Sequence, residues 1–187
     1  MQKLFGTALV AVGLVAAPSI ARAQMAGMPH HEFGVDVGIG YAKPSGGTGT
    51  FAIATPVDVR VGFVSSGSMM VEPRFTLNFI SGGGTFIAFD PGVNVLFKLG
   101  QGTGMHNLMG PYFTVGADAN IVSSKPSGGT STSGAIIGVN GGIGTRMPYG
   151  SGATRLEAFV GYKLKNTSLL SPNTFVIGAR IGLSLWH

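Results

Sequence analysis

The sequence has no cysteine among its 187 residues. A chain without cysteine has no disulfides and no thiolate chemistry, which excludes a disulfide-stapled secreted module. Charged residues are also scarce, at 10% of the chain, where about 25% is typical. A surface that faces water needs more charge than this. The formal net charge is +5, or +3 without Lys3 and Arg22 near the N-terminus. That value gives no indication of a nucleic-acid partner.

Long apolar runs are missing as well. Beyond the N-terminus the sequence has no stretch of about 18 or more apolar residues, so spanning helices do not explain the low charge. Hydrophobic residues still make up 44% of the chain, and 32 residues are glycine. The apolar residues alternate with polar or small ones, which is the period of a β-strand with two different faces. The sequence therefore predicts an all-β fold.

The N-terminus has a separate composition. Residues 1–24 read MQKLFGTALVAVGLVAAPSIARAQ, with Lys3 near the start, an apolar stretch, and small residues at Ala21 and Ala23. This is the layout of a secretory signal peptide that is cleaved after Ala23. We therefore divide the chain into a signal peptide, an N-terminal linker and a barrel domain: residues 1–23, 24–30 and 31–187.

The rest of the chain is a succession of alternating segments separated by clusters of Gly, Ser, Pro and Asn. The eight expected strands span about residues 31–42, 51–64, 69–80, 85–99, 108–122, 134–147, 154–164 and 174–187. Strands in soluble proteins average about five or six residues, whereas a tilted strand needs about ten to cross a bilayer. The segment lengths therefore favour strands that span a membrane.

The position of the charges indicates which face of the strands points inward. All acidic residues fall on the polar face of their segments: Glu32, Asp36, Asp58, Glu72, Asp90, Asp118 and Glu157. Most basic residues share that face, whereas Lys43, Lys125 and Lys165 lie in or next to loops. A soluble lipocalin-like barrel would show the same period, but a polar face rich in Gly, Asn, Thr and Ser with balanced charges suits a narrow lumen better.

Backbone physics then specifies the architecture. In hydrocarbon every N–H and C=O must be paired internally, so the sheet must close on itself. We expect a membrane-spanning, antiparallel, up-and-down β-barrel of about eight strands. Its lumen should hold a network of opposite charges made by Asp36, Asp58, Arg60, Glu72, Arg74, Asp118, Arg155, Glu157 and Arg180.

The alternation and the terminal segment IGARIGLSLW resemble the small outer-membrane barrels of Gram-negative bacteria. The chain is similar to the transmembrane domain of outer-membrane protein A and to its eight-stranded relatives. The resemblance implies an outer-membrane location, contact with outer-membrane lipid, and recognition of the C-terminal strand by the barrel assembly machinery. The alternation departs from that family at the end, because it places Trp186 on the lumen side and His187 where a lipid-facing aromatic is expected.

Enzymatic activity is not expected from the histidines. Some small barrels resemble lipid A deacylases or palmitoyltransferases, which need a serine beside a histidine and a carboxylate. The four histidines are His30, His31, His106 and His187, and none lies in mid-strand beside a serine. The pair His30 and His31 has no further ligand at a metal-like spacing, so a solvated linker is expected there and no metal or cofactor.

Three functions remain, in order of preference. The first is a structural or envelope-integrity barrel with a lumen largely plugged by ion pairs, since eight strands leave an interior that side chains just fill. The second is a narrow porin-like channel with a glycine wall, made by Gly34, Gly38, Gly40, Gly138, Gly142 and Gly144. The third is a surface interaction protein, although the loops lack the aromatic and arginine anchors that carry binding energy. No pattern in the sequence indicates an oligomeric state.

Overall fold

The computed structural model describes residues 31–53, 58–66, 68–82, 84–100 and 108–186. The expected signal peptide, the linker and His187 lie outside the described residues. The strands are β1 (His31–Pro44), β2 (Thr50–Ile53), β3 (Asp58–Ser66), β4 (Met69–Gly82), β5 (Gly84–Lys98), β6 (Gly110–Pro126), β7 (Thr132–Tyr149), β8 (Gly152–Lys163) and β9 (Thr174–Trp186). The described part of the chain contains no helix that is both long and apolar enough to cross a membrane.

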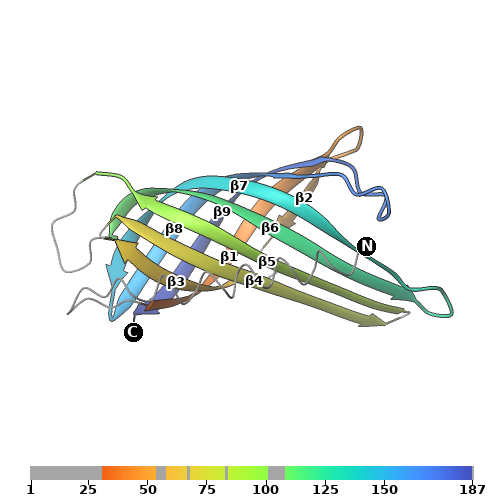
Figure 1. Ribbon diagram of the computed structural model, residues 1–187, viewed down its shortest axis with the longest axis horizontal. Coiled ribbons are helices and arrows are strands. Elements are labelled where there is room, and N and C mark those ends of the chain that lie inside the picture. The colour runs from red at the N-terminus through yellow and green to blue at the C-terminus, as the bar shows by residue number, and fades with distance from the viewer. Residues whose placement is uncertain (1–30, 54–57, 67, 83, 101–107, 187) are drawn as a thin grey trace.

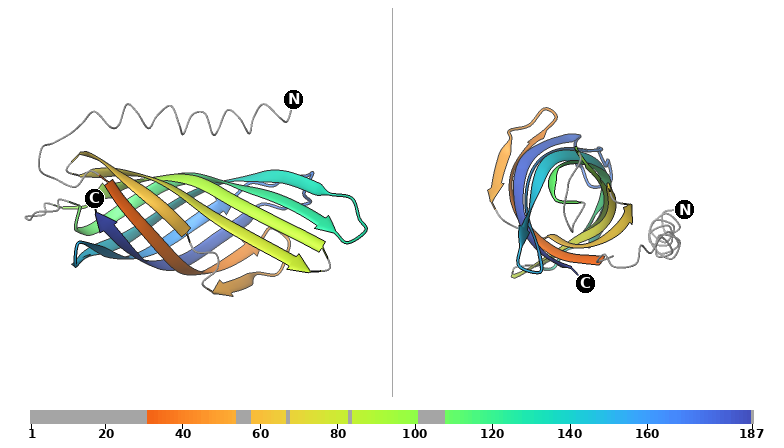
Figure 2. Two further views of the ribbon diagram at one scale, coloured as in Figure 1. Left: turned by 90° about the horizontal axis from the view of Figure 1, so that it is seen from below. Right: turned by 90° about the vertical axis from the view of Figure 1, so that its left-hand side faces the viewer.

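The sheet closes into a barrel (Figures 1 and 2). Each pairing is antiparallel, and the strand order is β2-β1-β3-β4-β5-β6-β7-β8-β9 with an additional pairing of β1 to β9. That last pairing extends from Glu32 opposite Trp186 to Pro44 opposite Thr174. The predicted all-β, up-and-down barrel is confirmed.

The single strand expected at residues 51–64 is wrong, because two strands lie there. Since β9 occupies one edge of β1, both β2 and β3 pair with the other edge. Ile39 is opposite Ile53 and Asp36 is opposite Asp58, so the partner strand has more residues than β1 over this interval and the ladder breaks. The sequence places Pro56, which has no N–H to donate, between them. Among the described strands, the closed ring of eight thus consists of β1 and β3–β9, and β2 pairs with β1 alone.

The two faces of the sheet differ as the alternation predicts. Along β1, the side chain of Phe33 is 53% exposed whereas that of its neighbour Glu32 is 2% exposed. Along β9, Leu183 is 56% exposed and Arg180 is 6% exposed. Apolar side chains thus cover the outside of the barrel and charged side chains fill the inside, the reverse of a soluble protein.

The two ends of the barrel are distinct. The start of β1 and the end of β9 lie at one end, at the left of Figure 1, which we call the proximal end. The β4–β5 and β6–β7 hairpins turn at the opposite, distal end. Three hairpin turns therefore lie at the proximal end, after β3, β5 and β7, and the others lie at the distal end.

The seam between the first and last strands can be tested by crosslinking. Val37 and Ile181 are opposite each other on the outer face, where directly paired Cα atoms are about 4.5–5.5 Å apart. This distance permits a disulfide, and the chain has no native cysteine to interfere. We expect Val37→Cys with Ile181→Cys to form an intramolecular disulfide on mild oxidation, detected by its mobility in non-reducing electrophoresis.

The control pairs Val37→Cys with Ile143→Cys, because Ile143 lies on β7, away from the seam. Equal crosslinking of both pairs, or of neither, contradicts closure between β1 and β9.

Candidate functional site

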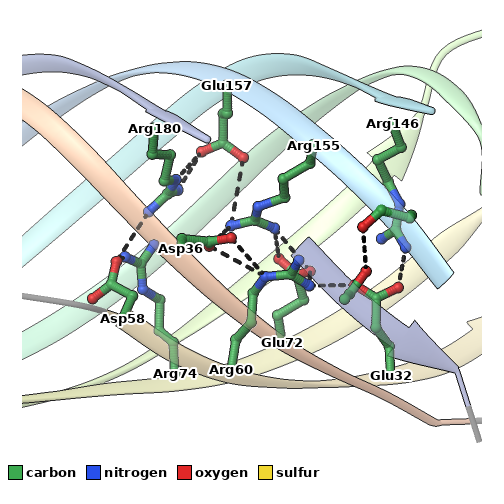
Figure 3. A network of polar contacts seen from close by, with 12 residues as sticks. Glu32, Asp36, Asp58, Arg60, Glu72, Arg74, Arg146, Arg155, Glu157 and Arg180 are labelled. Carbon is green, nitrogen blue, oxygen red and sulfur yellow. Dashed lines mark hydrogen bonds and ion pairs between the residues drawn. The ribbon is translucent and has the colours of Figure 1, made fainter. Parts of the chain in front are cut away.

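A network of charged side chains lies inside the proximal half of the barrel (Figure 3). It arises because the inward positions of several strands carry arginine or a carboxylate at neighbouring heights. Ion pairs join five arginines to five carboxylates: Arg60, Arg74, Arg146, Arg155 and Arg180 with Glu32, Asp36, Asp58, Glu72 and Glu157. The balance of signs matters, because an unpaired charge out of contact with water is very costly.

Arg60 lies at the centre of the proximal part of the network. Its Nε is 3.1 Å from Asp36 Oδ1, and its Nη1 is 3.3 Å from Glu72 Oε1. The same Nη1 also pairs with Glu32. Arg60 comes from β3 and its three partners come from β1 and β4. One guanidinium, 1% exposed, thus ties together three adjacent positions of the wall.

Arg155 on β8 extends the network across the lumen. Its Nη1 is 2.9 Å from Glu72 Oε2 on β4, and its Nη2 is 2.6 Å from Asp36 Oδ2 on β1. In the closed order of eight positions, β8 and β4 are four positions apart. The Glu72–Arg155 pair therefore connects opposite walls of the barrel. Both side chains are 1% exposed.

A second group of contacts surrounds Arg180 on β9. Arg180 Nε donates to Glu157 Oε1 at 2.8 Å, and its guanidinium lies 5.1 Å from the centre of the Phe159 ring. Arg180 Nη1 is also 3.8 Å from Asp58 Oδ2, and Asp58 in turn pairs with Arg74. Asp58 on β3 thus connects Arg74 on β4 to Arg180 on β9, the last strand.

Glu32 and Arg146 belong to the network but were not among the residues predicted for it. Arg146 on β7 pairs with Glu32. The indole Nε1 of Trp186 also donates to Glu32 Oε2, at 3.0 Å. Trp186 is therefore on the lumen side, as the alternation predicts. Glu32 and Arg146 share the inward phase, so the sequence did contain the signal that could have found them.

Apolar side chains lie inside the barrel beside this network. Met70, Leu96, Leu108 and Tyr112 form a buried cluster against which Val64 packs. Met70 and Leu96 are opposite each other on β4 and β5, near the proximal end. Tyr112 connects this apolar cluster to the charged network, since its hydroxyl donates to Glu157 Oε2 at 2.8 Å. Sequence reasoning missed this cluster, because apolar residues on the inward face are exceptions to the alternation.

Asp118 is placed apart from the other predicted residues. Its Oδ2 accepts a hydrogen bond from Asn140 Nδ2 at 3.2 Å, and none of the ion pairs found among the described residues includes it. Asp90 similarly accepts from Asn120. The structure thus joins eight of the nine predicted residues, and Asp118 belongs to a separate layer of carboxylates and amides.

The inward glycines make room for these large side chains. A Cβ added to Gly34 would lie 2.6 Å from Arg60 Nη2, and one added to Gly144 would lie 2.7 Å from Tyr112 Oη. At Gly138 and Gly142 it would lie 2.8 Å from Asp118 Oδ1 and 2.9 Å from Glu157 Oε1. Real Cβ atoms do not approach other atoms this closely, so each glycine accommodates a side chain from another strand. At these four positions the glycine wall is therefore covered by side chains from other strands.

Metal ligation has no candidate in the described part of the chain. No group of three or more His, Cys, Asp or Glu side chains there has an arrangement that could hold a metal ion. His30 and His106 lie outside the described residues.

Comparison with known proteins gives a match at the level of structure only. No protein-family model matches the sequence, and no curated protein is detectably similar to it. Neisserial surface protein A superimposes with a TM-score of 0.55 at 13% identity, over 84% of this chain and 97% of that chain. The attachment invasion locus protein Ail of Yersinia pestis gives 0.49 at 12% identity, covering 85% and 99%. The N-terminal barrel domain of Pseudomonas aeruginosa OprF gives 0.42 at 10% identity, covering 81% and 97%.

The fold is that of the small eight-stranded outer-membrane barrels. This conclusion rests on the closed sheet together with the match to Neisserial surface protein A. At 13% identity the match concerns the fold alone, so the location and function of this barrel have to be argued from its own residues.

Glu72 is the residue whose loss should cost the network most. In Glu72→Gln, Arg60 and Arg155 each lose a buried charge partner, and breaking such a pair costs about 3 kcal/mol. We expect the midpoint of unfolding in urea to fall accordingly, scored by electrophoresis of unboiled samples in detergent. Asp118→Asn is the matched control and should change the midpoint little, since Asp118 has only an amide contact. An equal loss in both variants would contradict the network.

The space beside the glycines can be tested in the same assay. In Gly144→Ala the added Cβ would lie 2.5 Å from the carbonyl oxygen of Leu156 as well as against Tyr112. Overpacking of this kind costs about 1–3 kcal/mol, so the folded barrel should be less stable. Gly161→Ala is the control, because its Cβ meets nothing closer than 3.5 Å. Its stability should be unchanged or higher by about 0.5 kcal/mol, and equal destabilisation of both variants contradicts the steric account.

Proposed function

We propose that the chain is an integral outer-membrane barrel with a structural, envelope-integrity role and a lumen closed by paired charges. The observation that carries this proposal is the Glu72–Arg155 pair, which joins opposite walls at 2.9 Å. A path for solutes along the axis would have to pass this pair and its neighbours.

The surroundings of this pair support a plug rather than a pore. Arg60, Asp36 and Glu157 surround Arg155, and all of them are 1% exposed. The buried apolar cluster around Met70 and Leu96 fills the lumen at the proximal end. Moving these side chains aside would leave several buried charges without partners. The free-energy cost of that is larger than the stabilisation from a single surface ion pair.

The narrow channel is the second candidate, and the inward glycines are what favoured it. Gly34, Gly138, Gly142 and Gly144 are covered by side chains from other strands, and a glycine that receives a side chain adds no free width. Gly38 and Gly40 differ, because an added Cβ would lie 3.0 Å from the carbonyl oxygen of Ala179 at Gly38 and no closer than 3.5 Å to any atom at Gly40. Gly40 lies nearer the distal end of β1, opposite Gly178.

Placement in the outer membrane is supported by the outer face of the barrel. Side chains such as Leu77, Ile143 and Leu185 are each more than 60% exposed, on strands long enough to cross hydrocarbon. A continuous apolar band of this kind fits lipid rather than water. The network is composed of paired arginines and carboxylates with no serine or histidine, so its residues serve packing and charge balance rather than catalysis.

Planar-bilayer recording separates the two candidates. We expect the purified barrel to give no steady conductance steps, and we expect Arg60→Ala and Arg180→Ala to remain silent as well, because the remaining side chains and the apolar cluster still fill the lumen. Discrete steps from the wild-type protein, or their appearance in either variant, would favour the channel.

A silent recording has meaning only for a folded barrel. Each preparation is therefore run on a gel with and without boiling, where a closed barrel changes mobility on heating. Recovery of the protein in the soluble periplasmic fraction, with no such shift, would contradict the membrane placement itself.

A further inference from the structure

Positive charge is concentrated at the distal end of the barrel. Lys43, Lys125 and Lys165 are exposed, and each lies at the distal end of its strand or in a distal loop. All acidic residues lie within the strands, and the distal loops at 45–49, 127–131 and 164–173 contain none. The distal end thus presents uncompensated positive charge at the boundary of the apolar band.

Two of these lysines lie on either side of the start of β9. Lys43 on β1 is opposite Phe175 on β9, and Phe175 is opposite Tyr162 on β8. The backbone N–H of Lys165 donates to Asn173 Oδ1 at 2.8 Å. A second contact, from the Ser45 N–H to Asn173 O at 2.7 Å, holds the β1–β2 turn beside the same residue. Asn173 therefore links the turn that follows Lys43 to the loop that carries Lys165.

The side chains in this row point out of the barrel. Lys43, Tyr162 and Phe175 share the phase of the exposed apolar residues, and Tyr162 and Phe175 are 42% and 47% exposed. The next outward row toward the proximal end is apolar, with Ile177 opposite Val160. Along β8 and β9 the outward side chains thus change from aliphatic to aromatic toward the distal end, where Lys43 lies in the row of the aromatic pair and Lys165 follows β8.

This order matches the layers of a lipid leaflet. Aliphatic side chains suit the acyl chains, aromatic rings suit the interface, and lysine side chains extend from the apolar band toward charged groups beyond it. A lysine near an anionic membrane surface contributes about 1 kcal/mol of attraction. The aromatic rings and lysines together therefore fit a ligand with an apolar tail and an anionic head.

We propose that the patch formed by Lys43, Tyr162, Lys165 and Phe175 binds the phosphate of a lipid headgroup in the leaflet at the distal end, with the lipid's acyl chains against Val160 and Ile177. The inference rests on the proposed membrane placement. A lipid is the occupant that the patch favours over a free anion, because the charged part is continuous with the apolar band.

The test is native mass spectrometry of the full mature barrel in detergent micelles, titrated with phosphatidic acid. Diacylglycerol with the same acyl chains lacks the phosphate and serves as the lipid control. Inorganic phosphate is added as a competitor to detect a site for the free anion. The variant pair is Lys43→Ala with Lys165→Ala, and Lys125→Ala is the protein control. Lys125 is also exposed and distal, but it is opposite Thr85 on β5, with no aromatic residue in that pair.

We expect the wild-type barrel to bind phosphatidic acid in preference to diacylglycerol, with little competition from inorganic phosphate. The double variant should bind phosphatidic acid about twenty-five-fold more weakly, from about five-fold per lysine. Lys125→Ala should stay close to wild type. Equal binding of the two lipids, an equal loss in Lys125→Ala, or full competition by inorganic phosphate would each overturn the proposal.

Failure of the lipid site and failure of the membrane placement give different results. Every variant is first checked for the change of mobility on boiling. A barrel that shows this change but has no preference for phosphatidic acid overturns the lipid site alone. A wild-type protein that shows no change overturns the membrane placement as well.

Discussion

The pairing of buried charges is the constraint on which the rest of this barrel depends. Five arginines and five carboxylates lie inside the barrel, all but Arg74 and Asp58 nearly inaccessible to water, and a buried charge of this kind would be prohibitively costly alone. The inward face therefore has to supply both signs at matching heights, from strands that are far apart in sequence. In the Glu72–Arg155 pair the two charges come from opposite walls of the barrel, on β4 and β8.

The glycines follow from the same constraint. A barrel of eight strands has a narrow interior, and guanidinium groups are long and planar. Space for them comes from neighbouring positions that carry no side chain, such as Gly34 beside Arg60. A high glycine content, which in a soluble strand would mean weakness, is here the counterpart of large charged residues. At Gly138 and Gly142 the side chains that take the space are the carboxylates of Asp118 and Glu157.

Alternation in the sequence was enough to predict the closed barrel and the face on which each charge lies, because parity along a strand fixes the face. It could not predict which charges meet. Asp118 has the inward phase but lies in another layer, whereas Glu32 and Arg146 meet across several strands. Those contacts depend on register between strands, which no single segment encodes. The division of residues 51–64 into β2 and β3 was missed for the same reason, because it appears only in the pairing with β1, where Ile39 is opposite Ile53 and Asp36 is opposite Asp58.

The contact between Trp186 and Glu32 has a consequence for assembly. It joins residues 154 positions apart, at the two ends of the folded chain. The entropy of closing so long a loop is recovered only when β1 and β9 meet, so every earlier stage must carry β1 with one edge unsatisfied. The only tryptophan of the chain lies at this junction. Its fluorescence thus reports the moment at which a growing sheet becomes a ring.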